Sequence, residues 1–221
     1  MKNIINHIAY FASFFTIVIF FAGCEKNESK ENETEVYSEY VENYVPYYIS
    51  PETMEQNSYW NFGSEPSIVL VISGSRISKT NSSTKAIYDS LASKYGDLNY
   101  KRNAEIERDG ALSVAIDSIF IVSDCDIDSE HPKGSNLSDI VKLSTKGYYE
   151  YINGGYKQID LGKDKLISEY KKYELSLLCH KHGLGFHFDK TLSIKGSHNF
   201  TITVVFENGK SLTSTQTVDF D

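Results

Sequence analysis

The densest group of soft metal ligands in the 221-residue chain lies in its C-terminal third. Cys179, His180 and His182 fall within four positions, and His187 follows five residues after His182. On a strand, His180 and His182 would share one face, and a turn through residues 183–185 would return His187 beside them. Imidazole nitrogens arranged in this way suit Zn²⁺ or Cu²⁺. The three histidines are therefore weak candidates for a metal site, and ordinary histidines of a polar hairpin are the favoured interpretation.

A second candidate group for metal chemistry is acidic. Asp124, Asp126 and Asp128 place carboxylates at every second position, and hard oxygen ligands at this spacing suit Ca²⁺. An EF-hand loop would need glycine at its sixth position and glutamate at its twelfth, where this chain has Ser129 and Ser135. Because neither position holds the residue that an EF-hand requires, we favour an acidic, solvated turn between sheet elements. A calcium loop of another type is the alternative.

Motifs that activate a nucleophile or bind phosphate are absent from the sequence. It contains no G-x-S-x-G elbow, no P-loop, no G-x-G-x-x-G turn and no H-E-x-x-H helix. Its adjacent carboxylates, such as Glu105 and Glu107, are common on surfaces and identify no acid–base couple. The net charge is −8 and arginine occurs only at positions 76, 102 and 108, which argues against a phosphate-binding surface. We expect neither an enzyme nor a nucleic-acid-binding protein.

Aromatic residues are crowded into residues 37–62, where they suggest a second kind of chemistry. They are Tyr37, Tyr40, Tyr44, Tyr47, Tyr48, Tyr59, Trp60 and Phe62. Flat Tyr and Trp faces stack on sugars at a low cost in conformational entropy. Such a density more often packs the first strand of a domain onto its core, so sugar stacking is the alternative interpretation.

The first 24 residues differ in composition from the rest of the chain. Lys2 is followed by an apolar run over residues 8–22, a pattern typical of a secretory signal. The run ends in Phe-Ala-Gly23-Cys24, which resembles the lipobox of bacterial lipoproteins. This resemblance implies cleavage between Gly23 and Cys24 and attachment of diacylglycerol and acyl groups to the Cys24 thiol. An uncleaved membrane anchor is the alternative, but a spanning helix needs about 20 apolar residues and this run is shorter.

An acidic segment follows the cysteine. Residues 25–42 hold seven Glu and two Lys, a net charge of −5, and have no apolar residue before Val36. Because such a segment buries too little to offset the entropy of ordering it, we expect a solvated tether. The sequence thus predicts a signal peptide at 1–23, a lipidated cysteine and tether at 24–42, and a single domain at 43–221.

Two cysteines remain once Cys24 is assigned to the lipid. An exported protein can form disulfides, and a Cys125–Cys179 bond would add about 2–4 kcal/mol of stability. Cys125 lies in a polar segment, whereas Cys179 falls in an apolar alternation. Nothing in the sequence forces the two together, so the pairing stays open.

Alternating apolar residues predict that the domain consists mainly of strands. A buried strand is expected over 67–72, a long one over 112–122, and a final hairpin over 200–220 with its turn at Asn208-Gly209. Leu112, Val114, Ile116, Phe120 and Val122 are expected to share one buried face of the long strand. Ile119 and Ile121 lie on its other face, which favours burial of the second half of this strand on both sides.

Weaker patterns predict a hairpin over 148–161, centred on Asn-Gly-Gly, and a strand over 175–179. One helix is expected over 81–95, capped by Ser82 or Ser83 and ended by Gly96. Its buried face would contain Ile87, Leu91 and Tyr95. Strands joined by short, turn-rich links, with one or two short helices, predict an antiparallel β-sandwich of the immunoglobulin-like type.

Two segments of the domain resemble a family of Bacteroidota outer-membrane lipoproteins with no assigned activity. Residues 119–137 contain the strand end Ser-Asp-Cys-Asp and the later His-Pro-Lys-Gly-Ser, and residues 199–220 resemble the closing strands of that family. Cys125 stands where a charged residue is expected. The acidic stretch after Cys24 also resembles the surface-export signal of such lipoproteins, which implies display on the outer face of the outer membrane. An orientation toward the periplasm is the alternative.

These observations together predict a lipid-anchored cell-envelope protein with a non-catalytic binding or assembly domain. Its expected partners are the membrane, through the acyl groups on Cys24, and an envelope protein or glycan; no other cofactor and no nucleic acid are expected. One alternative is a carbohydrate-binding lipoprotein that uses the aromatic residues of 37–62. The other is a metal-dependent enzyme built on His180, His182 and His187.

Overall fold

The computed structural model describes residues 46–57, 66–100, 109–157, 159–189 and 192–220. All of them belong to Val41–Asp221, the second of the two units into which the chain divides. The predictions for residues 1–42, including the signal peptide, the lipidation of Cys24 and the tether, lie outside the described residues. Within the described ranges, the structure contains no helix long and apolar enough to cross a membrane.

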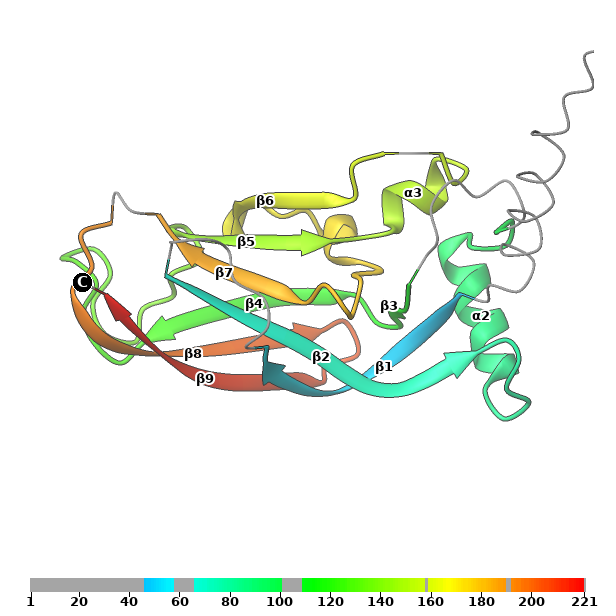
Figure 1. The fold of residues 1–221 in the computed structure, drawn as a ribbon, viewed down its shortest axis with the longest axis horizontal. Coiled ribbons are helices and arrows are strands. Elements are labelled where there is room, and N and C mark those ends of the chain that lie inside the picture. Colours follow the sequence, from blue (N-terminus) through cyan, green and yellow to red (C-terminus); the bar gives the residue numbers. More distant parts are fainter. Residues whose placement is uncertain (1–45, 58–65, 101–108, 158, 190–191, 221) are drawn as a thin grey trace, which may run out of the picture. The chain divides into compact units, whose positions relative to one another are not determined.

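The described residues form two β-sheets (Figure 1). In spatial order, the larger sheet contains β3 (Ala111–Leu112), β1 (Tyr47–Gln56), β2 (Ser67–Ser78), β7 (Leu184–Phe188), β5 (Val141–Lys146) and β6 (Gly162–Leu166). The smaller sheet contains β4 (Ile116–Ser123), β8 (Gly196–Phe206) and β9 (Ser211–Phe220). Neighbouring strands are antiparallel except for the short parallel pair of β1 and β3.

Helices are few and short. They are α2 (Lys85–Tyr95), α3 (Tyr149–Asn153) and the 3₁₀ turns η1 (Ile167–Glu169) and η2 (Lys172–Leu175). The prediction of a mainly β protein with antiparallel strands and few helices is confirmed. Its immunoglobulin-like topology stays a prediction.

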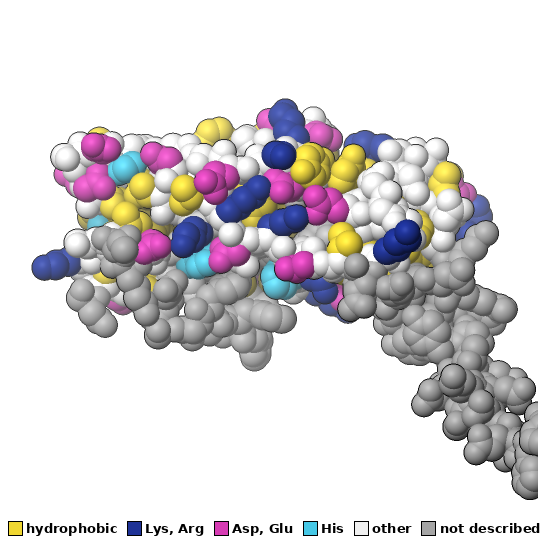
Figure 2. Space-filling view, turned by 90° about the horizontal axis from the view of Figure 1, so that it is seen from above, with side chains coloured by type: hydrophobic (Ala, Val, Ile, Leu, Met, Phe, Trp, Pro, Cys, Tyr) yellow, Lys and Arg dark blue, Asp and Glu magenta, His cyan; other side chains and the backbone are white. Residues whose placement is uncertain are grey.

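The edge strand β6 carries alternating charges. Lys163, Asp164 and Lys165 follow one another along it, and such charges discourage pairing with a further strand. Figure 2 shows the face of the molecule that carries β6 and α3, on which Lys, Arg, Asp and Glu side chains are interspersed and hydrophobic side chains lie between them.

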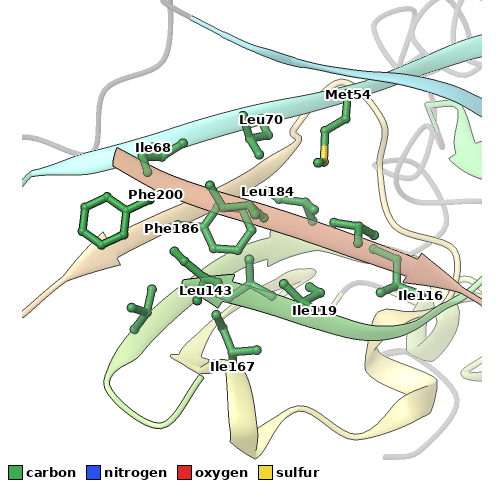
Figure 3. Close-up of a cluster of buried hydrophobic side chains, with 14 of the residues drawn as sticks. Met54, Ile68, Leu70, Ile116, Ile119, Leu143, Ile167, Leu184, Phe186 and Phe200 are labelled. Atoms are coloured by element: carbon green, nitrogen blue, oxygen red, sulfur yellow. The ribbon is translucent and has the colours of Figure 1, made fainter. Parts of the chain in front are cut away.

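The main hydrophobic core lies between the two sheets (Figure 3). Side chains of β2, β5 and β7 meet side chains of β4 and β8 there, and the rings of Phe188 and Phe200 lie 4.5 Å apart. Burying one such side chain contributes about 1.5–3 kcal/mol, so the paired inner faces account for much of the driving force for folding. The strand predicted over 67–72 is confirmed and extends to Ser78.

A β-bulge in β1 determines which of its side chains reach this core. The register shifts between Pro51 and Thr53, which leaves Glu52 as an extra residue. Strand side chains alternate between faces, so without the extra residue Ile49 and Met54 would lie on opposite faces of the sheet. With it, both are buried in the core between the sheets.

The bulge is held to β2 by a side chain and by a close backbone approach. The Glu52 carboxylate accepts hydrogen bonds from the backbone N–H of Ser75, at 3.1 Å, and from the Ser75 hydroxyl. These bonds lower the pKa of Glu52. Next to Ser75, Gly74 packs so tightly that an added Cβ would collide with the carbonyl oxygen of Ser50. Only glycine fits there without movement of the backbone.

A second bulge explains why the prediction for 112–122 is partly wrong. The segment forms two strands, β3 and β4, and β4 shifts register between Ile116 and Ser118, leaving Asp117 as an extra residue. The alternation therefore changes phase, so that Ile119 is buried together with Ile116, whereas Phe120 is 45% exposed. The prediction that Phe120 lies on the buried face is wrong for this reason.

The predicted helix is present, but its start and its buried face differ from expectation. It begins at Lys85 with Thr84, not Ser82 or Ser83, as the N-cap residue, and it ends at Gly96 as predicted, where φ is 73°. The buried residues are Tyr88, Ala92 and Tyr95, and Ile87 is 51% exposed. Tyr88 and Tyr95 pack on the aromatic ring of Tyr48, so the side of the helix that carries Ile87 faces away from the core.

The hairpin predicted over 148–161 is wrong. This segment contains the helix α3, and its buried residues Tyr148, Tyr151 and Ile152 have the i, i+3, i+4 spacing of a helix face. The strand predicted over 175–179 is also wrong. It contains the end of η2, a positive φ of 53° at Leu177, and two isolated bridge residues.

A second hydrophobic cluster lies where α2 and α3 meet the larger sheet, and it is dominated by tyrosine. Its fully or nearly buried tyrosines are Tyr48, Tyr88, Tyr95, Tyr148, Tyr151 and Tyr156. The buried carboxylate of Asp97 accepts hydrogen bonds from the hydroxyls of Tyr48 and Tyr156, both at 2.9 Å. The tyrosines therefore supply apolar rings for packing and hydroxyl groups that bind a buried carboxyl group.

The final hairpin is confirmed. β8 and β9 pair from Gly196 with Phe220 to Val205 with Ser211, and Gly209 has a φ of 81° in the turn. Apolar side chains of β8 enter the core, while threonines line its outer face. Across the outer face, hydroxyl groups pair at 3.1 Å between Thr201 and Thr215 and between Thr203 and Thr213.

We predict that Gly74→Ala lowers the free energy of unfolding by about 1–3 kcal/mol, because the methyl group forces β1 and β2 apart beside the bulge. Urea denaturation measures the change. Gly162→Ala on β6 is the matched control, since the nearest atom to its added Cβ is a flexible Asp160 carboxylate oxygen at 3.3 Å. Equal stability of the two variants would contradict the role assigned to the close approach.

Candidate functional site

His180, the first of the predicted metal ligands, lies in a turn and not on a strand. Its Nε2 atom is 3.0 Å from the hydroxyl oxygen of Tyr47, and the guanidinium of Arg76 lies 3.9 Å from the centroid of the Tyr47 ring. Burial lowers the pKa of His180, and the nearby Lys181 and Arg76 lower it further, against the opposing effect of Asp109. The neutral imidazole is therefore favoured, with a tyrosine as its partner.

His182 and His187 have other surroundings. His187 is the penultimate residue of β7, and its Nε2 atom is 2.8 Å from a carboxylate oxygen of Asp164 on β6. Burial lowers the pKa of His182, and the positive charge of Lys146 adds to this effect. The structure thus gives each of the three histidines its own neighbours. Across the described parts of the chain, no group of three or more His, Cys, Asp or Glu side chains is placed to hold a metal ion.

The predicted acidic turn uses its carboxylates to bind backbone N–H groups. Asp124 accepts hydrogen bonds from the backbone N–H of Asn199, at 2.8 Å, and from its side-chain amide, at 2.7 Å. Asp126 accepts one from the N–H of Lys133 at 2.7 Å. The bonds from Asn199 lower the pKa of Asp124, so it is ionised at neutral pH. These carboxylates order the loop instead of converging on one point.

Asp128 and His131 form the third part of this loop. The same carboxylate oxygen of Asp128 accepts hydrogen bonds from the N–H groups of Glu130 and His131 and lies 2.8 Å from the His131 Nδ1 atom. The other ring nitrogen of His131 lies 3.3 Å from Asp139. The bond with Asp128 raises the pKa of His131, and Asp139 raises it further. His131 thus favours its charged form between two carboxylates.

The two remaining cysteines are both free, so the disulfide left open by the sequence is not formed. Cys125 is exposed in the acidic loop. Partial desolvation raises the pKa of its thiol, and the adjacent negative charges of Asp124 and Asp126 raise it further. Cys179 is buried in the tyrosine cluster next to Tyr148. The surroundings of Cys125 thus act against the lowered pKa that activates a nucleophilic cysteine.

The aromatic residues proposed to stack on sugars divide into two groups. Tyr59, Trp60 and Phe62, like those before residue 46, lie outside the described residues. Of the two that the structure describes, Tyr48 is fully buried in the tyrosine cluster and Tyr47 lies between Arg76 and His180. Both make packing contacts within the domain.

Sequence reasoning missed a pocket beside α3, here called the α3 pocket. Its lining includes Tyr149 and Glu150 of α3, Lys163 of β6, Glu174 of η2 and the following Ser176. The pocket is a shallow hollow with a cavity volume of about 10 Å³, room for about one water molecule. The Lys163 ammonium lies 2.8 Å from Glu150, and this contact raises its pKa. Elements that follow one another closely in the sequence, α3, β6 and η2, therefore bring an aromatic ring and opposite charges to one place.

Glu174 is the most buried charged group of the α3 pocket, with its side chain only 7% exposed. Burial raises its pKa, but hydrogen bonds from the Lys165 ammonium, at 2.6 Å, and the Lys171 N–H, at 2.8 Å, outweigh that effect and lower the pKa overall. Both bonds reach the Oε2 atom; within the described residues, Oε1 has no hydrogen-bond donor. A buried, ionised carboxylate therefore presents one free acceptor.

Tyr149 of the pocket lining packs against Tyr173, which is not part of the lining. The ring centroids of Tyr149 and Tyr173 are 5.5 Å apart with an interplanar angle of 36°, and Tyr173 is 36% exposed. No short motif joins residues 149, 163 and 174, so only the local helical spacing after Tyr148 could have hinted at this arrangement. An apolar hollow of similar volume beside Cys179 and His180 offers no comparable set of polar groups.

Comparison of the chain with protein-family models, with curated proteins and with solved structures gives no match. The class that the structure itself defines is a mainly β protein with two sheets of antiparallel strands.

We predict that His131 stabilises the fold more at low pH than at high pH. A histidine with a raised pKa in the folded state contributes its full stabilisation below its unfolded pKa of about 6.5, and loses it as the pH rises through the folded value. The free energy of unfolding of His131→Gln should therefore fall further below that of the parent at about pH 5 than at about pH 8.5.

His182→Gln is the matched control, because burial lowers the pKa of His182 and reverses the sign. Its deficit relative to the parent should be smaller at the lower pH. Denaturant unfolding at both pH values measures the two differences, and the same trend in both variants would contradict the assignment.

Proposed function

We propose that this chain is a lipid-anchored cell-envelope protein whose β-sandwich domain is a non-catalytic binding or assembly module. The observation that carries this proposal is the apolar run of residues 8–22 followed directly by Gly23 and Cys24. Small residues before a cysteine at the end of a signal sequence are typical of a site of cleavage and lipidation. Several acyl chains on one cysteine would hold the protein stably at a bilayer, because each buried methylene contributes about 0.8 kcal/mol.

The contacts of the domain support a non-catalytic role. His180 contacts a tyrosine, His187 contacts Asp164, and the acidic side chains of the loop bind backbone N–H groups. Each of these groups thus contributes to the local structure in which it lies. A domain of this kind, joined to the anchor by the acidic segment 25–42, is suited to recognition at a membrane surface.

The acidic segment supports display on the outer face of the outer membrane. This segment is the most acidic region of the chain, with a net charge of −5 within 18 residues. A highly charged segment extends by self-repulsion and would hold the domain away from the bilayer. Retention on the periplasmic face is the alternative orientation.

We predict that Cys24→Ser abolishes lipidation. Cells that express the full chain in the presence of radiolabelled palmitate should incorporate label into the protein, and the Cys24→Ser variant should carry none and leave the membrane fraction. Cys125→Ser removes a different exposed thiol and is the control, so it should keep the label. Labelling of Cys24→Ser equal to that of the parent would overturn the proposed anchor.

A separate prediction concerns orientation. Protease added to intact cells should digest the domain if it is displayed outward, whereas digestion only after the outer membrane is opened would place it on the periplasmic face. A periplasmic protein of the same cells serves as the control for membrane integrity. The domain should disappear from intact cells at the rate seen for open ones.

A further inference from the structure

The two sheets have four edge strands, β3 and β6 in the larger sheet and β4 and β9 in the smaller one. An edge strand presents unpaired backbone N–H and C=O groups that can bind another strand, so proteins usually block it. β6 is blocked by the alternating charges of residues 163–165. β3 is only two residues long, and its outer side is occupied because the Leu112 N–H donates to the carbonyl oxygen of Leu178 at 2.9 Å.

β4 is covered by the loop that follows it. The N–H groups of Gly134 and Leu137 donate to the carbonyl oxygens of Ser123 and Ile121, respectively, both at 2.9 Å. The bulge at Asp117 interrupts the strand at its other end. β9 is therefore the remaining edge strand, and it lies at the border of the smaller sheet opposite β4 (Figure 1).

β9 is not blocked in any of these ways. Its residues 211–220 contain no proline, no lysine and no register shift, and Asp219 is their only charged residue. β1 of the other sheet lies close to β9 but pairs with β2 and β3. Within the described residues, the backbone of β9 has no hydrogen-bond partner other than β8. A long and regular strand thus leaves one side of its backbone unpaired.

The register of β8 determines which residues of β9 direct their backbone groups outward. The carbonyl oxygen of Asn199 accepts a hydrogen bond from the Asp124 N–H at 3.1 Å, so the odd-numbered residues of β8 face β4 and the even-numbered ones face β9. Phe200 is paired with Gln216, so the even-numbered residues of β9 bond to β8. The odd-numbered residues therefore turn their N–H and C=O groups away from β8. They are Ser211, Thr213, Thr215, Thr217 and Asp219.

β9 is complementary to itself in the antiparallel register that places Thr215 opposite Thr215 of a second copy. Each pair of outward-facing residues can then exchange two backbone hydrogen bonds. On the outer face, Thr213 comes opposite Thr217, which extends the threonine pairs already formed between β8 and β9. Asp219 comes opposite Ser211, so the two Asp219 carboxylates lie at opposite ends of the ladder and do not face each other.

The inner-face residues match in the same register. Leu212 comes opposite Val218, and Ser214 opposite Gln216, so apolar side chains meet apolar ones and polar side chains meet polar ones. A shift by two residues in either direction breaks this match, since it places Leu212 opposite Gln216 or Val218 opposite Ser214. Because a two-fold axis relates the two copies, the pairing closes at a dimer and uses the free edge of both.

We propose that β9 pairs with β9 of a second copy of this chain, so that the two smaller sheets join into one continuous sheet in the order β4-β8-β9-β9-β8-β4. Pairing through one strand is a small interface compared with the about 1,200–2,000 Å² of stable complexes, so we expect a dissociation constant in the micromolar range. The inference rests on the assembly role in the proposed function and names its partner, but the pairing itself does not depend on the lipid anchor.

Sedimentation velocity of the full chain in detergent micelles, with micelles in excess over protein, tests the proposal. The protein mass per particle should rise from one copy at about 1 μM to two copies at about 500 μM. A single copy at both concentrations, or growth beyond two copies, would overturn it. The Cys24→Ser variant should pair as the parent does, so the pairing and the anchor can fail separately. Loss of the dimer in Cys24→Ser would assign the association to the lipid and refute the role of β9.

A proline variant with a matched control locates the contact. Because the Thr215 N–H faces away from β8, Thr215→Pro removes a donor of the proposed ladder and places a ring at the edge, while the hydrogen bonds between β8 and β9 are kept. This variant should weaken pairing at least about 10-fold. Thr215→Val keeps the N–H and the branched side chain, so it should stay within about 3-fold of the parent. Equal pairing by Thr215→Pro and the parent would contradict the proposal.

Amide hydrogen exchange of the parent, read residue by residue by mass spectrometry, decides the outcome if Thr215→Pro unfolds. The N–H groups of Ser214 and Gln216 bond to β8, so they should be protected at every protein concentration. Those of Thr213, Thr215 and Thr217 should exchange at least about 10-fold more slowly at about 500 μM than at about 1 μM. If these three exchange equally fast at both concentrations, β9 is not the interface and the proposal is wrong.

Discussion

The phase of side-chain alternation along β1 and β4 is the constraint on which the sandwich depends. In each strand, the apolar residues before and after one position are separated by an odd number of residues. Without an extra residue at that position, the two sets would face opposite sides of the sheet. One extra residue in each strand, Glu52 and Asp117, restores the phase. The close approach of Gly74 to Ser50 and the bonds of Glu52 to Ser75 hold the first bulge in place, so a few polar and backbone contacts determine how the hydrophobic side chains meet.

The larger sheet is covered at one end by helices as well as by the smaller sheet, and this arrangement creates the α3 pocket. Tyr148 and Tyr151 anchor α3 in the tyrosine cluster by burying one of its faces. The intervening Tyr149 and the adjacent Glu150 are then directed outward, toward the ends of β6 and η2. The pocket is thus a consequence of tyrosine packing: the residues that bind the helix to the core also fix the positions of those that line the surface.

Local patterns in the sequence were sufficient for some elements and not for others. The alternation in β8 and β9 with Asn208-Gly209 between them, and Gly96 at the end of α2, rely on neighbouring residues and were predicted well. The exposure of Phe120 depends on a bulge, and the buried face of α2 depends on Tyr48, which is distant in sequence. The α3 pocket could not be predicted because Glu150, Lys163 and Glu174 come together only through tertiary packing. The histidine hypothesis assumed a strand where the chain makes a turn.

The two bulges also restrict how this protein can change in length during evolution. Deleting Glu52 or Asp117 alone would rotate the rest of its strand by half a period and expose one set of apolar side chains while burying a polar set. Deleting two consecutive residues would keep the facing of the side chains. Homologous strands should therefore differ by even numbers of residues at these points, so an alignment that places a single gap there marks either an error or a rearranged core.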